Sequence, residues 1–165
     1  MTSPSDDPFP DSVRAVIKFL DQAGISFQVR TFEEPAQRAA QAARLLGCPL
    51  GAVVKSLIFQ GKQTGELLLV LVSGANRADA QCLSTFFGQE TNPAHPRVVE
   101  FSTGYPVGAV PPVGFSKQPQ TLMDQDLMDY PVVWASAGAV HTMIGMAPEN
   151  LVQVSQAQIM AIRED

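Results

Sequence analysis

One lysine stands inside a stretch that otherwise has the pattern of a buried strand. Residues 51–59 read GAVVKSLIF, with apolar residues on both sides of Lys55. In extended geometry Lys55 and Ser56 point to opposite faces, and both faces are otherwise largely apolar. Lys55 must therefore find a partner, reach water, or sit desolvated in a cleft. A desolvated lysine has a lowered pKa and is often functional, whereas an edge lysine discourages aggregation, and the local pattern leaves both interpretations open.

Two further segments have residue types that suit the binding of a carbonyl group. Residues 104–114 read GYPVGAVPPVG, and residues 136–138 read SAG directly after a predicted strand. A glycine such as Gly108 lets backbone approach a ligand closely, and neighbouring prolines keep the N–H directions fixed, as oxyanion stabilisation requires. Taken alone, a loop of this composition is more often a simple surface connection.

The familiar catalytic motifs are absent from the sequence. It has no Gly-x-Ser-x-Gly, no phosphate-binding glycine loop, no His-Glu-x-x-His and no paired carboxylates at helical spacing in an apolar frame. A Cys/His pair could be drawn from Cys82 with His95 or His141, but Cys82 lies on the apolar face of a predicted helix, which favours packing. Without Cys-x-x-Cys spacing we expect no metal, no cofactor and no disulfide, and we expect Cys48 and Cys82 to be buried thiols.

Length and composition predict one globular domain. The chain has 165 residues, 45% hydrophobic and 16% charged, with a net charge of −5. We expect a flexible N-terminus at residues 1–10 and a single domain over residues 11–165. The N-terminus lacks the features of a signal peptide and no apolar run approaches about 18 residues, which predicts a cytoplasmic protein with no membrane partner. The acidic charge predicts no DNA binding and only local contact with any nucleic acid.

Periodicity and turn residues predict alternating helices and strands. Asp11 or Ser12 should cap a first helix that ends at Gly24, and Asn76 or Asp79 should begin another through Phe87. The prolines and glycines of residues 92–114 predict an irregular loop, because a helix or central strand would not tolerate them. The other expected elements are strands at 25–32, 51–59, 67–72, 121–123, 132–135 and 142–146, with 51–59 and 67–72 forming a central hairpin, and helices at 35–46, 124–128 and from Pro148.

The order of four motifs resembles the YbaK/prolyl-tRNA-synthetase-associated domain family, whose members are aminoacyl-tRNA deacylases that edit mischarged tRNA. The motifs are VVKSL at 53–57, LVSG at 71–74 followed by Asp79, TGYPVGAVPP at 103–112, and WASAG at 134–138. The family signature Gly-x-x-x-Pro falls on Gly108 and Pro112. The resemblance extends from about residue 13 to residue 154. After Gly138 this chain has the residues AVHT, where many relatives have a Gly- or Pro-Asn-type sequence.

The resemblance implies a fold and a set of site residues. The expected fold is α+β, a single domain with a mixed, curved, barrel-like sheet and surrounding helices. Lys55 would lie in the pocket and position the aminoacyl ester, and Gly108 would hold the substrate carbonyl through backbone donors. Water would attack with help from the substrate's own groups. The further substrate-binding residues are Ala109, Val110, Pro112, Ser136, Gly138 and His141, although His141 could equally be a surface residue, and Asp79 has a sufficient role as a helix cap.

The leading functional hypothesis is a free-standing aminoacyl-tRNA deacylase that hydrolyses the ester of a small, wrongly attached amino acid. Its expected partners are the acceptor end of mischarged tRNA and, as a second candidate, an aminoacyl-tRNA synthetase. Two alternatives stay open: a non-catalytic ligand-binding or regulatory module of the same fold, and a hydrolase of small-molecule esters or thioesters. The residue types do not identify the amino acid, because one or two heavy atoms change binding by only about 1–3 kcal/mol.

Overall fold

The centre of the structure is a buried strand whose two faces both pack against other elements. The computed structural model describes residues 8–165, so the flexible N-terminus expected at residues 1–10 lies mostly outside the described residues. The central strand β3 (Leu67–Ser73) pairs antiparallel with β2 (Val54–Gly61) and parallel with β5 (Gln120–Asp124). The predicted central hairpin is therefore confirmed.

The strands form two sheets. β4 (Thr91–Pro93) and β8 (Gln158–Met160) complete a mixed five-stranded sheet in the order β4-β2-β3-β5-β8. The second sheet is antiparallel, in the order β1-β7-β6, and consists of β1 (Gln28–Thr31), β7 (Thr142–Met146) and β6 (Val133–Ala139). A bridge between Val53 and Trp134 connects the sheets. The α+β class with mixed pairing is confirmed, and over residues 8–165 the strands do not close into a barrel.

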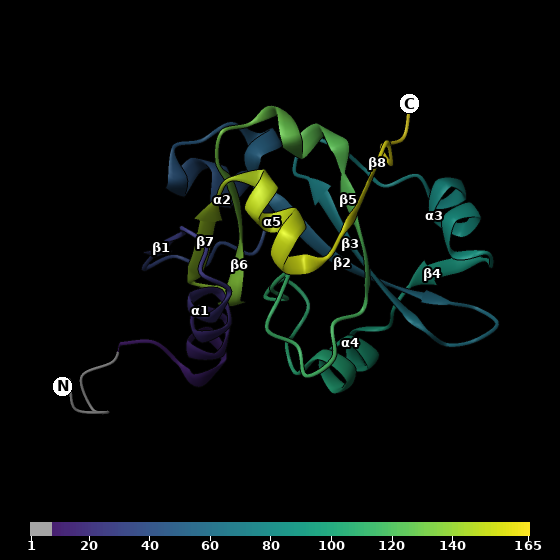
Figure 1. Ribbon diagram of the computed structural model, residues 1–165, viewed down its shortest axis with the longest axis horizontal. Coiled ribbons are helices and arrows are strands. Elements are labelled where there is room, and N and C mark those ends of the chain that lie inside the picture. The colour runs from purple at the N-terminus through teal and green to yellow at the C-terminus, as the bar shows by residue number, and fades with distance from the viewer. Residues whose placement is uncertain (1–7) are drawn as a thin grey trace.

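The helices lie around the two sheets (Figure 1). α1 (Asp11–Ala23) and α5 (Pro148–Ser155) enclose the main core between the two sheets, with Leu20 and Leu151 fully buried there. α3 (Ala80–Phe87) covers the other face of the five-stranded sheet. α2 (Ala39–Leu46) packs through Ala42 against Trp134 and Met143. Because β3 has core on both faces, its sequence is apolar without alternation.

Some predicted boundaries were wrong, and each error has a local cause. α1 begins at Asp11 itself, with Pro10 at the cap position and no side-chain cap. The helix expected from Pro35 begins only at Ala39, because the Ala36 N–H donates to the Val140 carbonyl (2.6 Å). The segment predicted to be irregular contains helix α4 (Pro96–Thr103).

In α4, proline and glycine stand at the helix ends. Pro96 occupies the first turn, where its missing N–H costs nothing, and Gly104 ends the helix with φ +81°. The helix expected at residues 124–128 is instead a 3₁₀ turn, Gln125–Asp129, and a second 3₁₀ turn, Leu50–Ala52, precedes β2. β8 was not predicted. The two cysteines are partly exposed rather than buried. In the described part of the chain, no helix combines the length and apolar character needed to cross a membrane.

Asp79 caps α3, and we expect its loss to affect stability rather than chemistry. Its carboxylate accepts the Gln81 N–H (2.9 Å). Asp79→Ala should lower the free energy of unfolding by about 1 kcal/mol, whereas Asp79→Asn, which also caps helices well, should retain most of it. Urea unfolding of both variants measures this difference. An activity loss in Asp79→Asn at unchanged stability would instead assign Asp79 to the catalytic machinery.

Candidate functional site

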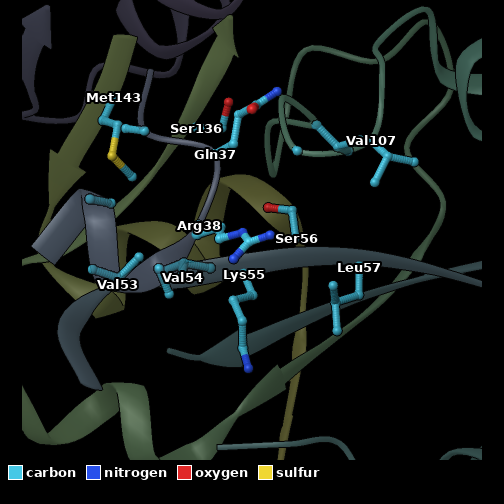
Figure 2. A pocket seen from close by; sticks show the side chains of 15 residues that line it. Gln37, Arg38, Val53, Val54, Lys55, Ser56, Leu57, Val107, Ser136 and Met143 are labelled. Atoms are coloured by element: carbon cyan, nitrogen blue, oxygen red, sulfur yellow. The ribbon is translucent and has the colours of Figure 1, made fainter. Parts of the chain in front are cut away.

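A cavity of about 360 Å³ lies beside the first half of β2 (Figure 2). Four parts of the chain form its walls: residues 36–42, residues 53–57, the loop at residues 107–110, and the second sheet through Ser136 and Met143. Three of these parts contain motifs that the sequence had singled out. The cavity therefore brings Lys55, the loop residues Gly108 and Val110, and Ser136 together from three separate parts of the sequence.

The cavity exists because β2 is paired along only one edge in this region. β3 pairs with β2 from Val54 to Gln60, whereas β4 pairs with it only from Phe59 to Gly61. The second edge at Ser56 thus has no neighbouring strand among residues 8–165. Backbone groups of alternate residues point to opposite edges, and the Ile58 carbonyl accepts the Ala94 N–H (2.9 Å) on the β4 side. The peptide groups of Ser56 therefore face this open edge too.

Ser56 is the unsatisfied polar group of the cavity. Its Oγ is buried and, within the described residues, has no hydrogen-bond partner. In Figure 2 its side chain projects to the side of β2 on which Gln37 and Ser136 lie. The Ser136 Oγ already accepts the Gly138 N–H (3.2 Å). A buried hydroxyl without a partner is costly, and in a cavity it is available to a ligand.

Lys55 lines the cavity but directs its amine away from it. The Lys55 side chain projects to the opposite side of β2 from Ser56 (Figure 2), and Nζ donates to the backbone carbonyl of Asn76. Burial lowers the pKa of Lys55 below its ordinary value, the nearby charge of Arg77 lowers it further, and Asp124 partly opposes both. The sequence had left three possibilities for this lysine: a partner, contact with water, or desolvation in a cleft. The structure provides a partner, the uncharged carbonyl of Asn76.

A network of hydrogen bonds fixes the carbonyl that receives Lys55. Asp124 is 1% exposed and accepts from the Ser73 N–H (3.1 Å), the Asn76 Nδ2 (2.9 Å) and the Asp126 N–H (3.0 Å). Asn76 Nδ2 also donates to Asp126 (2.8 Å). Three donors compensate the burial of the Asp124 carboxylate and hold Asn76 in position.

The loop at Gly108 has a conformation that favours glycine. Gly108 has φ +90°, and the Ala109 N–H closes a turn onto the Pro106 carbonyl (3.0 Å). A methyl group at Gly108 would lie 3.7 Å from Gln37, which is an ordinary contact. An added methyl group would therefore not clash with the protein at this position, and the need for glycine comes from the backbone conformation.

The remaining predicted site residues lie outside the cavity wall. Ala109 is 1% exposed, and the Pro112 carbonyl accepts from Gln118 (3.0 Å). Gly138 has φ +100° and leaves only 3.0 Å between an added Cβ and the Tyr105 ring. His141 is exposed in the turn between β6 and β7, where its carbonyl accepts the Phe32 N–H (2.8 Å).

Sequence reasoning missed three polar residues of the cavity, namely Ser56, Gln37 and Arg38. Ser56 could have been identified as the one hydroxyl in a strand with apolar residues on both faces. Gln37 and Arg38 had been placed inside a predicted helix, so their position at the site depended on the non-helical path of residues 36–38.

The alternative Cys/His pair is not assembled. The Cys82 thiol donates to the Ala161 carbonyl (3.6 Å), and burial, with a smaller contribution from Asp79, raises its pKa. The Nδ1 atom of His95 accepts the Arg97 N–H (3.1 Å) and caps α4. Across residues 8–165, no three His, Cys, Asp or Glu side chains converge in a group that could hold a metal ion.

Comparisons with known proteins agree on one family. Residues 33–154 match the family model "Aminoacyl-tRNA editing domain". The chain is 29% identical over 149 residues to "Putative Cys-tRNA(Pro)/Cys-tRNA(Cys) deacylase EbsC" of Enterococcus faecalis (strain ATCC 700802 / V583), covering 88% of this chain and 90% of that one. It is 25% identical over 152 residues to "Multifunctional Ser/Thr-tRNA deacylase ProXp-y" of Escherichia coli (strain K12), covering 90% of each.

A solved structure has the same fold over nearly the whole chain. It is named "Crystal structure of a putative trans-editing enzyme for prolyl tRNA synthetase" and superposes with a TM-score of 0.88 at 33% identity, covering 95% of this chain and 99% of that one. The hypothetical protein APE2540 superposes with a TM-score of 0.85 at 26% identity, covering 91% of this chain and 99% of that one.

The lowered pKa of Lys55 predicts a specific pH dependence of stability. Between the folded-state pKa and the higher pKa of the unfolded chain, the unfolded state binds more protons, so the free energy of unfolding rises with pH. Relative to Lys55→Met, the wild type should therefore become more stable as pH increases through this alkaline range. Urea unfolding of both proteins between pH 7 and about 10.4, the ordinary lysine pKa, measures the difference. A difference that stays constant or shrinks would contradict the desolvation of Lys55.

Proposed function

The chain belongs to the aminoacyl-tRNA editing domain family, and from that membership we propose that it is an aminoacyl-tRNA deacylase. The reaction is hydrolysis of the ester between a small, wrongly attached amino acid and the terminal ribose of tRNA. The products are the free amino acid and uncharged tRNA. Removal of the wrong amino acid before the tRNA is used preserves translation fidelity. The likeness to a structure named as a trans-editing enzyme supports action on tRNA that a synthetase has already charged.

The observation that carries the proposal is the cavity between the Gly108 loop and the open edge of β2. The Gly108 N–H makes no hydrogen bond with residues 8–165, so it remains available as a donor. Water attack on the ester carbon places negative charge on the carbonyl oxygen, and the tetrahedral intermediate then expels the ribose oxygen, which takes up a proton. A backbone donor held at a fixed direction stabilises that oxygen in the transition state.

The cavity wall also supports a reaction without a protein nucleophile or base. Its lining residues within the described chain include no Asp, Glu, His or Cys. We therefore assign activation of the water to groups of the substrate itself, such as its α-amine or the neighbouring ribose hydroxyl. An aminoacyl ester is already an activated linkage, so positioning and charge stabilisation account for most of the required catalysis.

Lys55 is assigned the role of positioning the ester. Its place in the cavity wall and its lowered pKa support this role, because a lysine with these properties is a frequent functional group. Its amine is bonded to Asn76 in the substrate-free arrangement, so contact with the ester requires the flexible side chain to leave that carbonyl. The exposed Arg38 guanidinium at the cavity offers a local contact for a phosphate of the acceptor end, which suits a chain of net charge −5.

The test is deacylation of tRNAs charged with cysteine, alanine, serine, threonine and proline. We expect the wild type to hydrolyse one or two of these and Lys55→Ala to hydrolyse none. Gly108→Ala should lower kcat/KM by about 10²-fold, the loss typical of one misplaced oxyanion donor. Gly65→Ala is the matched control, because Gly65 also has positive φ (+74°) but lies in the turn between β2 and β3.

Three outcomes would contradict the proposal. Failure to hydrolyse any charged tRNA would favour a binding module of the same fold. Equal hydrolysis of simple amino acid esters that lack tRNA would favour a small-molecule esterase. Full activity of both Gly108→Ala and Lys55→Ala would show that hydrolysis does not take place in this cavity.

Ser56 offers a separate test, in which activity should fall without a loss of stability. Ser56→Ala removes a buried hydroxyl that has no partner, so the free energy of unfolding should stay equal or rise. Deacylation should become slower, because this unpaired hydroxyl faces the cavity and can bond the substrate. Ser73→Ala is the control, because the Ser73 Oγ donates to the Gly51 carbonyl (2.7 Å), and its loss should cost about 0.5–1.5 kcal/mol. Destabilisation of Ser56→Ala would show that the hydroxyl has a structural role.

A further inference from the structure

Asp124 is the one buried residue between positions 8 and 165 that has an acidic or basic side chain. It lies at the end of β5, directly before the 3₁₀ turn Gln125–Asp129. Removing a carboxylate from water is costly unless its oxygens accept hydrogen bonds. The partners of those two oxygens therefore indicate what this residue does.

The two carboxylate oxygens of Asp124 bond different parts of the chain. Oδ1 accepts the Asp126 N–H (3.0 Å), which caps the 3₁₀ turn. Oδ2 accepts the Ser73 N–H (3.1 Å) and the Asn76 Nδ2 (2.9 Å). Capping requires only one oxygen. The second oxygen instead serves the end of β3 and the residue whose carbonyl receives Lys55.

We propose that Asp124 is a positioning residue for Lys55, which holds the lysine amine in place through Asn76 and keeps it protonated for its contact with the substrate ester. This inference rests on the proposed function, in which a charged Lys55 positions the ester. It assigns to the buried carboxylate a part in the reaction that its place outside the cavity does not reveal.

The geometry supplies the first half of this role. Lys55 Nζ donates to the Asn76 carbonyl, on the side of β2 away from the cavity (Figure 2). Asn76 is fixed through its backbone, because its N–H donates to the Ser73 carbonyl (2.9 Å), and through its side chain, which bonds both Asp124 and Asp126. A lysine side chain has many rotamers, and a fixed acceptor holds its amine at one position.

The charges behind β2 supply the second half. Burial lowers the pKa of Lys55, the exposed Arg77 lowers it further, and Asp124 acts against both. The other two charges of this region, Asp126 and Arg163, pair with each other (3.5 Å). Asp124 is therefore the group that opposes loss of the lysine proton. A lysine that has lost its proton has no charge with which to attract an ester carbonyl.

The first experiment follows the side-chain ¹³Cε signals of the full chain by NMR as the pH is raised. The chain has four lysines, and Lys55→Met identifies the Lys55 signal. We expect Asp124→Asn to lower the pKa of Lys55 and Arg77→Gln to raise it. Asp129→Asn is the matched control, because it removes one negative charge from the exposed end of the same turn and should leave the titration unchanged. A Lys55 titration that Asp124→Asn does not move would overturn the inference.

The second experiment measures kcat/KM across the neutral and alkaline range, with the charged tRNA that the wild type hydrolyses fastest and with uncatalysed hydrolysis subtracted. Activity should fall as pH rises through the pKa of Lys55, because the reaction uses the charged amine. The fall should begin at lower pH in Asp124→Asn and at higher pH in Arg77→Gln. Above both midpoints Asp124→Asn should be about tenfold slower than the wild type, the size of one lost charge-assisted hydrogen bond.

The position of this fall separates a positioning role from a structural one. Titrating groups of the substrate are the same for every variant, so they cannot move the fall between variants. A purely structural Asp124 would lower kcat/KM equally at every pH, and that result would overturn the inference.

A double variant decides the case in which Asp124→Asn does not fold. When Lys55→Met is added, the amine that needs the negative charge is gone, so cooperative urea unfolding should return. Equal loss of folding with and without Lys55 would show that Asp124 serves only the turn and the end of β3, and would overturn the inference.

The two experiments distinguish this inference from the proposed function. Deacylation with the same pH dependence in all variants would leave the function standing and overturn the role of Asp124. The expected changes in Lys55 titration, without hydrolysis of any charged tRNA, would support the effect of Asp124 on the lysine and overturn the function.

Discussion

The site depends on the one-sided pairing of β2. β3 satisfies one edge of this strand along its length, whereas β4 reaches the other edge only at Phe59–Gly61. β4 is short because Pro93 cannot donate to a ladder and Pro96 begins α4, which leads the chain away from the sheet. Exposed strand edges normally invite pairing with other chains. Here the edge is enclosed by residues 36–38 and the loop at residues 107–110, so unpaired backbone becomes the floor of a cavity.

Two adjacent polar residues of β2 point to opposite faces of the strand, and only one of them has a hydrogen-bond partner. Lys55 points toward the face where Asn76 and the buried Asp124 carboxylate form a satisfied network, so its charge is tolerated. Ser56 points into the cavity and has no partner within the described residues. An unsatisfied buried hydroxyl costs about 1–3 kcal/mol, and stable proteins rarely carry such a cost away from functional sites. The unpaired group therefore marks the cavity more directly than the lysine does.

The sequence predicted those features that depend on neighbouring residues. The continuous apolar run of β3 required two covered faces, and extended geometry placed Lys55 opposite Ser56. Of the two helix starts predicted, Asn76 and Asp79, the second caps α3. Features that depend on distant contacts were not predictable. The late start of α2 follows from the bond between Ala36 and Val140, and the position of the Lys55 amine follows from Asn76 and Asp124, which lie 21 and 69 residues away in the sequence. The orphaned Ser56 hydroxyl appears only once the whole cavity is assembled.

The motif residues that carry the family resemblance divide into those that line the cavity and those that shape it. Gly108, Val110 and Ser136 line it. Gly138 instead allows β6 to bend where an added Cβ would meet the Tyr105 ring and the Ser12 carbonyl, at 3.0 and 3.1 Å. Tyr105 in turn donates to the Gly114 carbonyl (3.3 Å) and packs edge-on against Phe115, which fixes both ends of the loop that carries Gly108. Because the described lining includes no Asp, Glu, His or Cys, we expect the geometry of this loop to determine reactivity in the proposed function. Residues that hold the loop from behind are consequently as necessary to the motif as residues that face the ligand.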